Sequence, residues 1–327
     1  MRDFSYQQAD SVGAAIKAHA TDKDSAYIAG GTTLLDLAKL EVMRPAKLVD
    51  VRKTGFDEIE RLDDGRLRIG TNVTNTDLAY HEDVQKHYTV LSEALLSGAS
   101  TSIRNKATTG GNVMQRVRCS YFRDNVSPCN KRNPGSGCSA IDGFNRSVYA
   151  VLGTSKHCIV AHPSDMCVAM AAIGATISVQ GPNGQREIDF LDFHLKPGNT
   201  PWKEHALDAD EMITHVTLDA PIEGAKSHYL KLRDRASYQF ALASSGVIVA
   251  VDGGVVKQAR IALGGVGTKP WRAHNAEQAL VGQPIDQANF EQVAKLAFQD
   301  AQAYEHNAFK IPLGQQAIVR SLTTVTA

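Results

Sequence analysis

The sequence predicts an α+β fold in two domains, and three observations support this prediction. Short apolar runs with strand character alternate with segments whose apolar residues recur every three to four positions, as in helices. After about residue 226 this alternation gives way to three strand-like runs followed by alanine-rich helical segments. Finally, 43% of the 327 residues are hydrophobic and 21% are charged, which is typical of a globular protein and excludes a disordered or fibrous one.

The first part of the N-terminal domain, residues 1–55, reads as a small α/β unit. We expect a helix over 14–20, a strand over 26–29, a glycine turn, a helix over 34–42 and a strand over 47–51, which follows Pro45. The second part, residues 56–222, begins with a strand over 67–70. Capping residues at Thr76 and Asp77 and the helical spacing of 91–96 predict two helices that lead to a second glycine turn.

A polar stretch over about 116–158 then interrupts the second part. It has no sustained strand or helix period, and so long a loop is unusual unless it is functional or held together by covalent bonds or a metal. The regular pattern resumes with a helix over 166–173 and a strand over 175–180 that ends in the turn Gly181-Pro182-Asn183-Gly184 and predicts a hairpin. Strands over 229–232, 247–251 and 258–263 and helices from 276 onward form a second domain, residues 223–327.

The overall charge narrows the classes of function. With 35 Lys and Arg against 35 Asp and Glu, the chain has no net charge and is not a general binder of polyanions such as nucleic acid. No apolar run approaches the ~18 residues that cross a bilayer, so we expect no membrane insertion. An acid at the third position, Asp3, also argues against a signal peptide.

The first glycine turn is the segment Ala29-Gly30-Gly31-Thr32-Thr33-Leu34, between a strand and a helix. Such a turn can bind an anion, because glycines let backbone N–H groups converge, threonines add hydroxyl donors, and a helix N-terminus carries partial positive charge. Its spacing is neither that of a Rossmann motif nor that of a Walker A loop. A plain glycine turn with a threonine helix cap is the alternative interpretation.

The second glycine turn, Thr108-Thr109-Gly110-Gly111-Asn112, has the same combination of threonines and paired glycines and is followed by Gln115. Two matching anion cradles predict one long ligand, since a pyrophosphate that links two nucleoside halves would use both. A third glycine-rich segment, Gly264-Gly265-Val266-Gly267-Thr268-Lys269, has the wrong spacing for a phosphate loop. We interpret it as a turn.

Four of the five cysteines, Cys119, Cys129, Cys138 and Cys158, lie in the polar stretch. Their spacings lack the short knuckles of most structural zinc sites, whereas a 4Fe-4S cluster takes four thiolates and tolerates longer gaps. Nine Lys and Arg against two acids between positions 101 and 160 favour thiolates and anionic ligands. The alternatives to a cluster are a nonspecific basic loop, a nucleic-acid-binding patch or two disulfides. The fifth cysteine, Cys167, lies on an apolar helix face and is expected to be a core residue.

These motifs, together with His162-Pro163-Ser164-Asp165, resemble the FAD-binding medium subunit of the xanthine dehydrogenase and aldehyde oxidase family of molybdenum hydroxylases. The resemblance runs almost end to end. Most members pass directly from the second glycine turn to the Ser-Asp element, whereas about forty extra residues intervene here and hold the cysteines. In this the chain is similar to the FAD and 4Fe-4S subunit of bacterial three-subunit molybdenum aldehyde oxidoreductases, which are often periplasmic.

The resemblance implies a two-part FAD-binding domain of the vanillyl-alcohol-oxidase-like type and a C-terminal flavoprotein-type domain of a small sheet and helices. It also implies a 4Fe-4S cluster on Cys119, Cys129, Cys138 and Cys158. Asp165 would bind the adenosine side of the FAD and Lys231 the flavin, although a helix cap and a surface charge are their alternative roles. The full implied set of FAD-binding residues is Ala29, Gly30, Gly31, Thr32, Thr33, Leu34, Thr108, Gly111, Asn112, Gln115, Asp165, Ile213 and Lys231.

The implied function is that of an electron relay. A large subunit with a molybdenum cofactor would oxidise an aldehyde to a carboxylic acid, a small subunit with 2Fe-2S clusters would pass the electrons on, and FAD on this chain would deliver them to an external acceptor. Relatives that reduce NAD tend to carry an acidic residue in the stretch that here reads Ala236-Ser237-Tyr238-Gln239-Phe240, and Tyr238 suggests a flavin face adapted to another acceptor, so we expect an acceptor other than NAD. Co-export with a partner that bears a signal would place the complex in the periplasm; otherwise it is cytoplasmic.

Two other functions are compatible with the sequence. One is a stand-alone FAD oxidase or dehydrogenase in which the cysteines hold structural zinc, and the other is a non-catalytic scaffold that docks a partner through a basic cysteine loop. No acid–base or nucleophile constellation is present, so we predict no catalytic residue on this chain. The content of iron, zinc and flavin separates the three possibilities.

Overall fold

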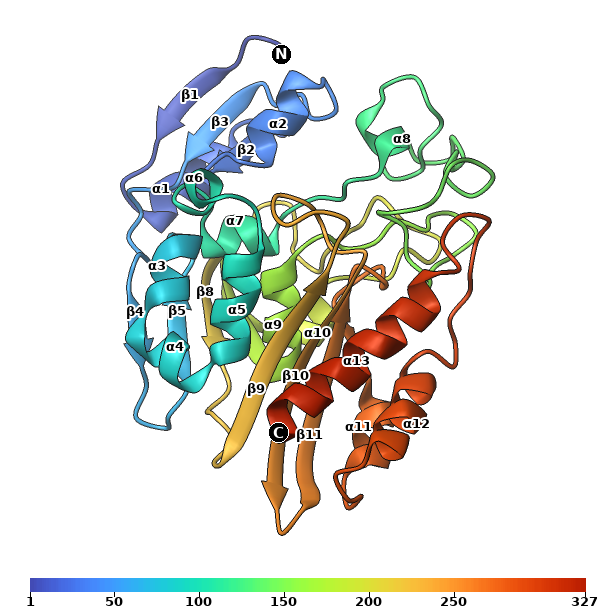
Figure 1. The fold of residues 1–327 in the computed structure, drawn as a ribbon. Helices are drawn as coiled ribbons and strands as arrows, with labels where there is room; N and C mark the ends of the chain where they lie inside the picture. The colour runs from blue at the N-terminus through green and yellow to red at the C-terminus, as the bar shows by residue number, and fades with distance from the viewer.

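The computed structural model describes residues 1–327 and contains three β-sheets (Figure 1). The first is a small parallel sheet in the order β1-β3-β2, formed by β1 (Ser5–Gln8), β2 (Ser25–Ile28) and β3 (Lys47–Asp50). The connections run through α1 (Val12–Ala20), which Ser11 caps, and α2 (Leu34–Lys39). This is the α/β unit that the sequence predicts for its first fifty residues.

The second sheet is antiparallel and has the strand order β4-β5-β8-β6-β7. Its helices pack on one face, α7 begins within the second glycine turn, and residues 166–173 of α9 are all buried. The strands are β4 (Ile59–Arg61), β5 (Leu67–Gly70), β6 (Ala175–Gly181), β7 (Gly184–Asp189) and β8 (Met212–Leu218). The helices are α3 (Asn75–Tyr80), α4 (Glu82–His87), α5 (Thr89–Ser97), α6 (Thr101–Arg104), α7 (Thr109–Val113), α9 (Asp165–Ile173) and α10 (Phe190–Phe193).

The third sheet is the C-terminal one, with the order β12-β11-β10-β9. Helix α13 crosses β9 and β10, α12 packs on α13, and α5 and α9 contact the same sheet from the N-terminal side (Figure 1). The elements are β9 (Ala225–Leu232), β10 (Ala243–Asp252), β11 (Val255–Gly264), β12 (Trp271–Arg272), α11 (His274–Leu280), α12 (Gln287–Ala297) and α13 (Lys310–Thr326).

The polar stretch of residues 116–158, hereafter the cysteine insertion, contains one short helix, α8 (Ser120–Arg123), and extends beside the small parallel sheet in Figure 1. It has its own apolar cluster, which includes Phe122 and Tyr149. Side-chain contacts tie it to other elements: Arg123 donates to Asp36 at 2.7 and 3.0 Å. The insertion is therefore a packed substructure and not an unstructured loop.

The observed elements confirm the predicted α+β class, while strands β1, β4 and β8 and the short helices α4 and α6 are among the elements that were not predicted. The hairpin of β6 and β7 forms as predicted. Strand β8, which was not predicted, lies in the middle of the second sheet between β5 and β6. Its register pairs Leu218 with both Leu67 and Ala175, so its partners lie far away in the chain. None of the helices is both long and apolar enough to span a bilayer.

Candidate functional site

The first glycine turn joins β2 to α2 and presents free backbone donors. Gly31 has a φ of +72°, in the left-handed region that glycine adopts without strain. The backbone N–H groups of residues 31–34 donate to no other atom of the chain, and Thr33, the N-cap of α2, makes no side-chain cap bond. Four consecutive free N–H groups at a helix start are an anion-binding arrangement.

Glycine at position 30 is required for a different reason. A Cβ on Gly30 would overlap the backbone carbonyl of Lys106, so the first turn lies directly against the segment that leads to the second turn. A Cβ on Gly110 would likewise overlap the Thr71 side chain. The two glycine turns thus meet by close backbone approach, as the pairing of the two motifs predicts.

The second turn does not supply a second set of free donors. The N–H groups of Thr109 and Gly110 donate to carbonyl oxygens of Val73 and Thr71, and that of Gly111 donates to the Thr108 hydroxyl at 3.2 Å. The expectation of two matching anion cradles is therefore wrong in this respect. The second turn contributes surface and side chains to the site, while the first turn contributes the free backbone donors.

A cleft of about 730 Å³ opens between the two turns, a volume within the range of small-molecule and cofactor sites. It lies where the small parallel sheet meets the second sheet. Of the residues expected to bind FAD, those that line the cleft are Ala29, Gly30, Gly31, Thr32, Thr33, Leu34, Thr108, Gly111, Gln115 and Ile213. Segments far apart in the sequence thus form one cavity.

Four residues of the cleft wall each carry a buried polar atom without a hydrogen-bond partner. The hydroxyl of Tyr27, Nε2 of His162 and Nδ1 atoms of His194 and His205 are buried and unpaired, and all four residues line the cavity. Burial lowers the pKa of His162 well below its ordinary value and that of His194 to about 4, so both rings are neutral at neutral pH.

The structure places Asn112, Asp165 and Lys231 outside the cleft wall. Asn112 accepts hydrogen bonds from Gln115 at 2.8 Å and from the Ser164 hydroxyl at 2.6 Å. Asp165 and Lys231 form a buried ion pair, with 2.8 Å between Nζ and Oδ2. Direct contact of these three residues with FAD stays a prediction.

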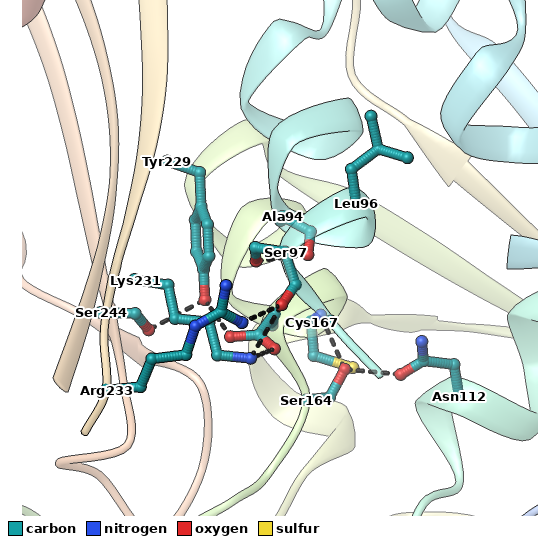
Figure 2. A network of polar contacts seen from close by, with 12 residues as sticks. Ala94, Leu96, Ser97, Asn112, Ser164, Cys167, Tyr229, Lys231, Arg233 and Ser244 are labelled. Atoms are coloured by element: carbon teal, nitrogen blue, oxygen red, sulfur yellow. Dashed lines mark hydrogen bonds and ion pairs between the residues drawn. The ribbon is translucent and has the colours of Figure 1, made fainter. Parts of the chain in front are cut away.

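The ion pair belongs to a polar network between α9 and β9 (Figure 2). The Tyr229 hydroxyl donates to Asp165 at 2.7 Å and contacts Ser244 at 2.9 Å, while Lys231 also donates to the carbonyl of Ser97. The alternative roles considered for the pair are wrong: the Lys231 side chain is only 3% exposed, and Ser164, not Asp165, caps α9.

The four cysteines of the insertion converge on one second cavity. Cys119, Cys129, Cys138 and Cys158 all line it, and an isolated β-bridge pairs Cys129 with Cys138. Cys138 is the only one of the four that is not fully buried. Burial raises the pKa of the Cys119 and Cys138 thiols, and it raises the pKa of Cys158 to about 11. A bound cation is therefore needed to keep these groups as thiolates.

The arrangement of the sulfurs bears on which bonds hold the insertion together, disulfides or a metal centre. All five cysteines are free, which removes the disulfide alternative. Tetrahedral zinc with Zn–S bonds of about 2.3 Å requires sulfurs roughly 3.8 Å apart. At one place in the structure, at least three ligand atoms of His, Cys, Asp or Glu lie within 4.8 Å of one another. Only His162, Cys167 and His194 form such a group, and none of the four insertion cysteines belongs to it. No three of the four insertion sulfurs therefore lie within 4.8 Å of one another.

Sequence analysis placed Cys167 correctly in the core, where it is fully buried. It did not find the polar groups of the cleft that come from distant segments, namely Tyr27, His162, His194 and His205. His162 directly precedes the Pro163-Ser164-Asp165 motif and could have been considered on that signal. The other three have no motif around them.

A cleft between two glycine turns, of which the first has free backbone donors, next to four converging thiols, defines a dinucleotide-binding redox protein. Family comparison agrees: residues 2–220 match the FAD binding domain in molybdopterin dehydrogenase, and residues 228–324 match the CO dehydrogenase flavoprotein C-terminal domain. The chain belongs to the FAD-binding medium subunits of the molybdenum hydroxylase family and is an oxidoreductase component. The predicted boundary at 222/223 lies between the two matched ranges and stays a prediction.

Individual relatives agree with the family. The chain is 45% identical to the aldehyde oxidoreductase FAD-binding subunit PaoB of Escherichia coli K12, over 100% of this chain and 99% of that protein. It is 27% identical to the nicotinate dehydrogenase FAD-subunit of Eubacterium barkeri, over 83% and 76%. The crystal structure of quinoline 2-oxidoreductase from Pseudomonas putida 86 shares the fold, with a TM-score of 0.77 at 24% identity over 99% and 97% of the two chains.

Proposed function

We propose that this chain is the FAD and 4Fe-4S electron-transfer subunit of a heterotrimeric molybdenum aldehyde oxidoreductase. The aldehyde class rests on full-length similarity to an aldehyde oxidoreductase FAD-binding subunit. The observation that carries the cluster assignment is the convergence of Cys119, Cys129, Cys138 and Cys158 on one cavity beside the dinucleotide cleft. When bound, the flavin and the cluster supply one- and two-electron redox chemistry that amino-acid side chains lack.

The residues of the cleft fit FAD in a defined way. The free N–H groups of residues 31–34 hold an anionic pyrophosphate at the start of α2, where the helix end adds partial positive charge. Neutral His162 and His194 line the cleft without placing a further charge in it. The remaining wall includes Ile213 and Met212, which exclude water from the ligand.

The residues of the cysteine cavity fit an iron-sulfur cluster. Four thiols from one insertion match the four ligands of a 4Fe-4S cluster, and apolar side chains such as Phe122 and Ile159 surround them. Lys131 lies in the same wall and offsets the negative charge of a thiolate-ligated cluster. The insertion and its metal are expected to fold together, because binding free energy becomes folding free energy in such sites.

As a relay, the chain requires partners on both sides. We propose that electrons arrive from 2Fe-2S clusters of a small subunit, which draws them from a molybdenum-cofactor subunit that oxidises aldehydes, and that they leave to an external acceptor other than NAD. The complex is periplasmic if a partner carries an export signal and cytoplasmic otherwise. The N-terminal sequence of the large subunit decides between these compartments.

The test is the cofactor content of the purified protein. We expect flavin absorption bands with a broad iron-sulfur shoulder, four irons per chain and bleaching by dithionite. FAD with zinc and no iron would instead support the stand-alone flavoprotein with a structural zinc loop. A preparation that holds neither FAD nor iron after anaerobic reconstitution would overturn the proposed function.

A further inference from the structure

The dinucleotide cleft and the cysteine cavity share a wall. Two residues of the insertion, Val117 and Lys131, line both cavities. Val117 is buried and apolar, and the Lys131 side chain is 9% exposed. A single layer of side chains therefore separates the two proposed cofactor sites, and this layer contains one buried positive charge.

A small ion-pair cluster holds Lys131 in this wall. Its Nζ lies 3.1 Å from Oε1 of Glu204 and donates to the backbone carbonyl of Pro201 at 2.9 Å. Arg116, also from the insertion, donates through Nε to the other carboxylate oxygen of Glu204 at 2.6 Å. Two cations thus share one anion, and the cluster keeps a net positive charge.

Glu204 belongs to the segment of residues 202–205, which lines the dinucleotide cleft. Burial opposes ionisation of Glu204, but the attraction of Lys131 and Arg116 outweighs it and holds its pKa below the ordinary value. The Glu204 carboxylate is therefore charged at neutral pH. Through it, the cysteine insertion is bonded to a segment that forms the FAD site.

Charge close to a redox centre changes its potential, because a nearby cation stabilises the added electron. Lys131 is placed to act on both centres at once, since it lines both cavities and is largely shielded from water. Water and salt screen exposed lysines of the same loop, such as Lys156, much more strongly.

We propose that Lys131 is a positioning residue that couples the two cofactor sites, by bonding the cysteine insertion to Pro201 and to Glu204 of the cleft wall and by raising the reduction potentials of both centres. This inference rests on the proposed function, because it requires that FAD and the cluster bind where the residues indicate. Glu204 is its counterpart and lowers both potentials by opposing the same charge.

The test uses the full chain loaded with both cofactors and compares four variants. Lys131→Met should lower the midpoint potentials of flavin and cluster together, and should raise the FAD dissociation constant about tenfold, equivalent to ~1.4 kcal/mol. Lys131→Arg should keep values close to those of the parent protein. Glu204→Gln should shift both potentials upward, the opposite direction. Lys156→Met, an exposed lysine of the same insertion, is the matched control and should change neither potential.

Spectroelectrochemical titration and fluorescence titration of FAD provide the readouts. Unchanged potentials in Lys131→Met and Glu204→Gln, with FAD and iron at parental stoichiometry, would overturn the inference. If Lys131→Met does not retain its cofactors, Glu204→Gln decides: an upward shift supports the coupling, and no shift refutes it. A parent protein without iron or flavin defeats the proposed function itself, and this is known before any variant is made.

Discussion

Lys231 on β9 forms a buried ion pair with Asp165 at the start of α9, with 2.8 Å between Nζ and Oδ2. The two side chains are 3% and 9% exposed, and they come from the third sheet and from the helix that fills the core between the second and third sheets. Tyr229 adds a hydrogen bond to the same carboxylate. The pair therefore joins the N-terminal and C-terminal parts of the chain at a point without access to solvent.

Replacing Lys231 with Met should destabilise the protein by about 3 kcal/mol, because removal of one partner leaves the Asp165 carboxylate buried without its cation. Urea denaturation measures this loss. Lys257→Met is the matched control: this lysine is 55% exposed and lies 3.7 Å from Asp252, so its loss should cost less than about 1 kcal/mol. Loss of bound FAD from Lys231→Met at unchanged stability would instead place Lys231 at the flavin.

Gly30→Ala should abolish high-affinity binding of FAD. The added methyl group would collide with the backbone carbonyl of Lys106, which cannot move without separating the two glycine turns. We expect at least a tenfold rise in the FAD dissociation constant, about 1.4 kcal/mol, by fluorescence titration. Gly13→Ala introduces the same methyl group into α1 with no atom within 4 Å, and should bind FAD like the parent protein. Equal affinity of the two variants would contradict the assigned role of the first turn.

Cys129→Ser and Cys138→Ser should each lower the iron content and the iron-sulfur absorption, since each removes one of four ligands. Cys167→Ser should leave both unchanged, because Cys167 is buried in α9 and lines neither cavity. Iron analysis and visible spectra of the three proteins provide the comparison. If all three lost iron equally, the assignment of the ligands would be wrong.

The stability of the FAD-free protein should fall with decreasing pH. Burial lowers the pKa of His194 to about 4, below the value of 6.5 expected for the unfolded chain, so the unfolded state binds the proton first. Its contribution is fully present above pH 6.5 and disappears as the pH falls toward 4. For His194 alone the change is about 3 kcal/mol. His162, whose pKa burial also lowers, adds in the same direction.

Urea denaturation across this pH range measures the effect. His194→Gln should flatten the pH dependence, because glutamine does not titrate. His274→Gln, at a histidine that is 61% exposed, should retain the slope of the parent protein. A slope that is the same in all three proteins would show that other groups cause the loss of stability.

Much of the fold could be predicted from the sequence, because many elements depend on neighbouring residues. Strand β5 has the predicted bounds, and Ser164 and the following apolar residues define α9. Strand β8 was missed although four of its seven residues are β-branched, and its place between β5 and β6 could not be predicted because these partners lie far away in the chain. The parallel strand β1 escaped prediction because all four of its residues are exposed and polar or amphipathic.

The candidate site divides in the same way. The composition of the two glycine turns and the four cysteines was visible in the sequence, and most of the expected residues line the cleft. The hydrogen bonding of the second turn was not visible in the sequence, because its N–H groups donate to carbonyl oxygens of Thr71 and Val73, more than thirty positions earlier. The burial of Lys231 was not visible in the sequence either, because it depends on an ion pair with Asp165 of helix α9.

By itself, then, the sequence determined which chemistry was available: glycines that permit a close turn, threonines beside them, and a quartet of thiols in a basic insertion. Backbone preferences and ligand types are properties of individual residues and their neighbours, so they can be read from the amino-acid sequence. Only the tertiary structure decided which donors stay free, at residues 31–34, and which cation lies between the two cavities, Lys131. These depend on hydrogen bonding and desolvation by distant segments, which arise only when the chain has folded.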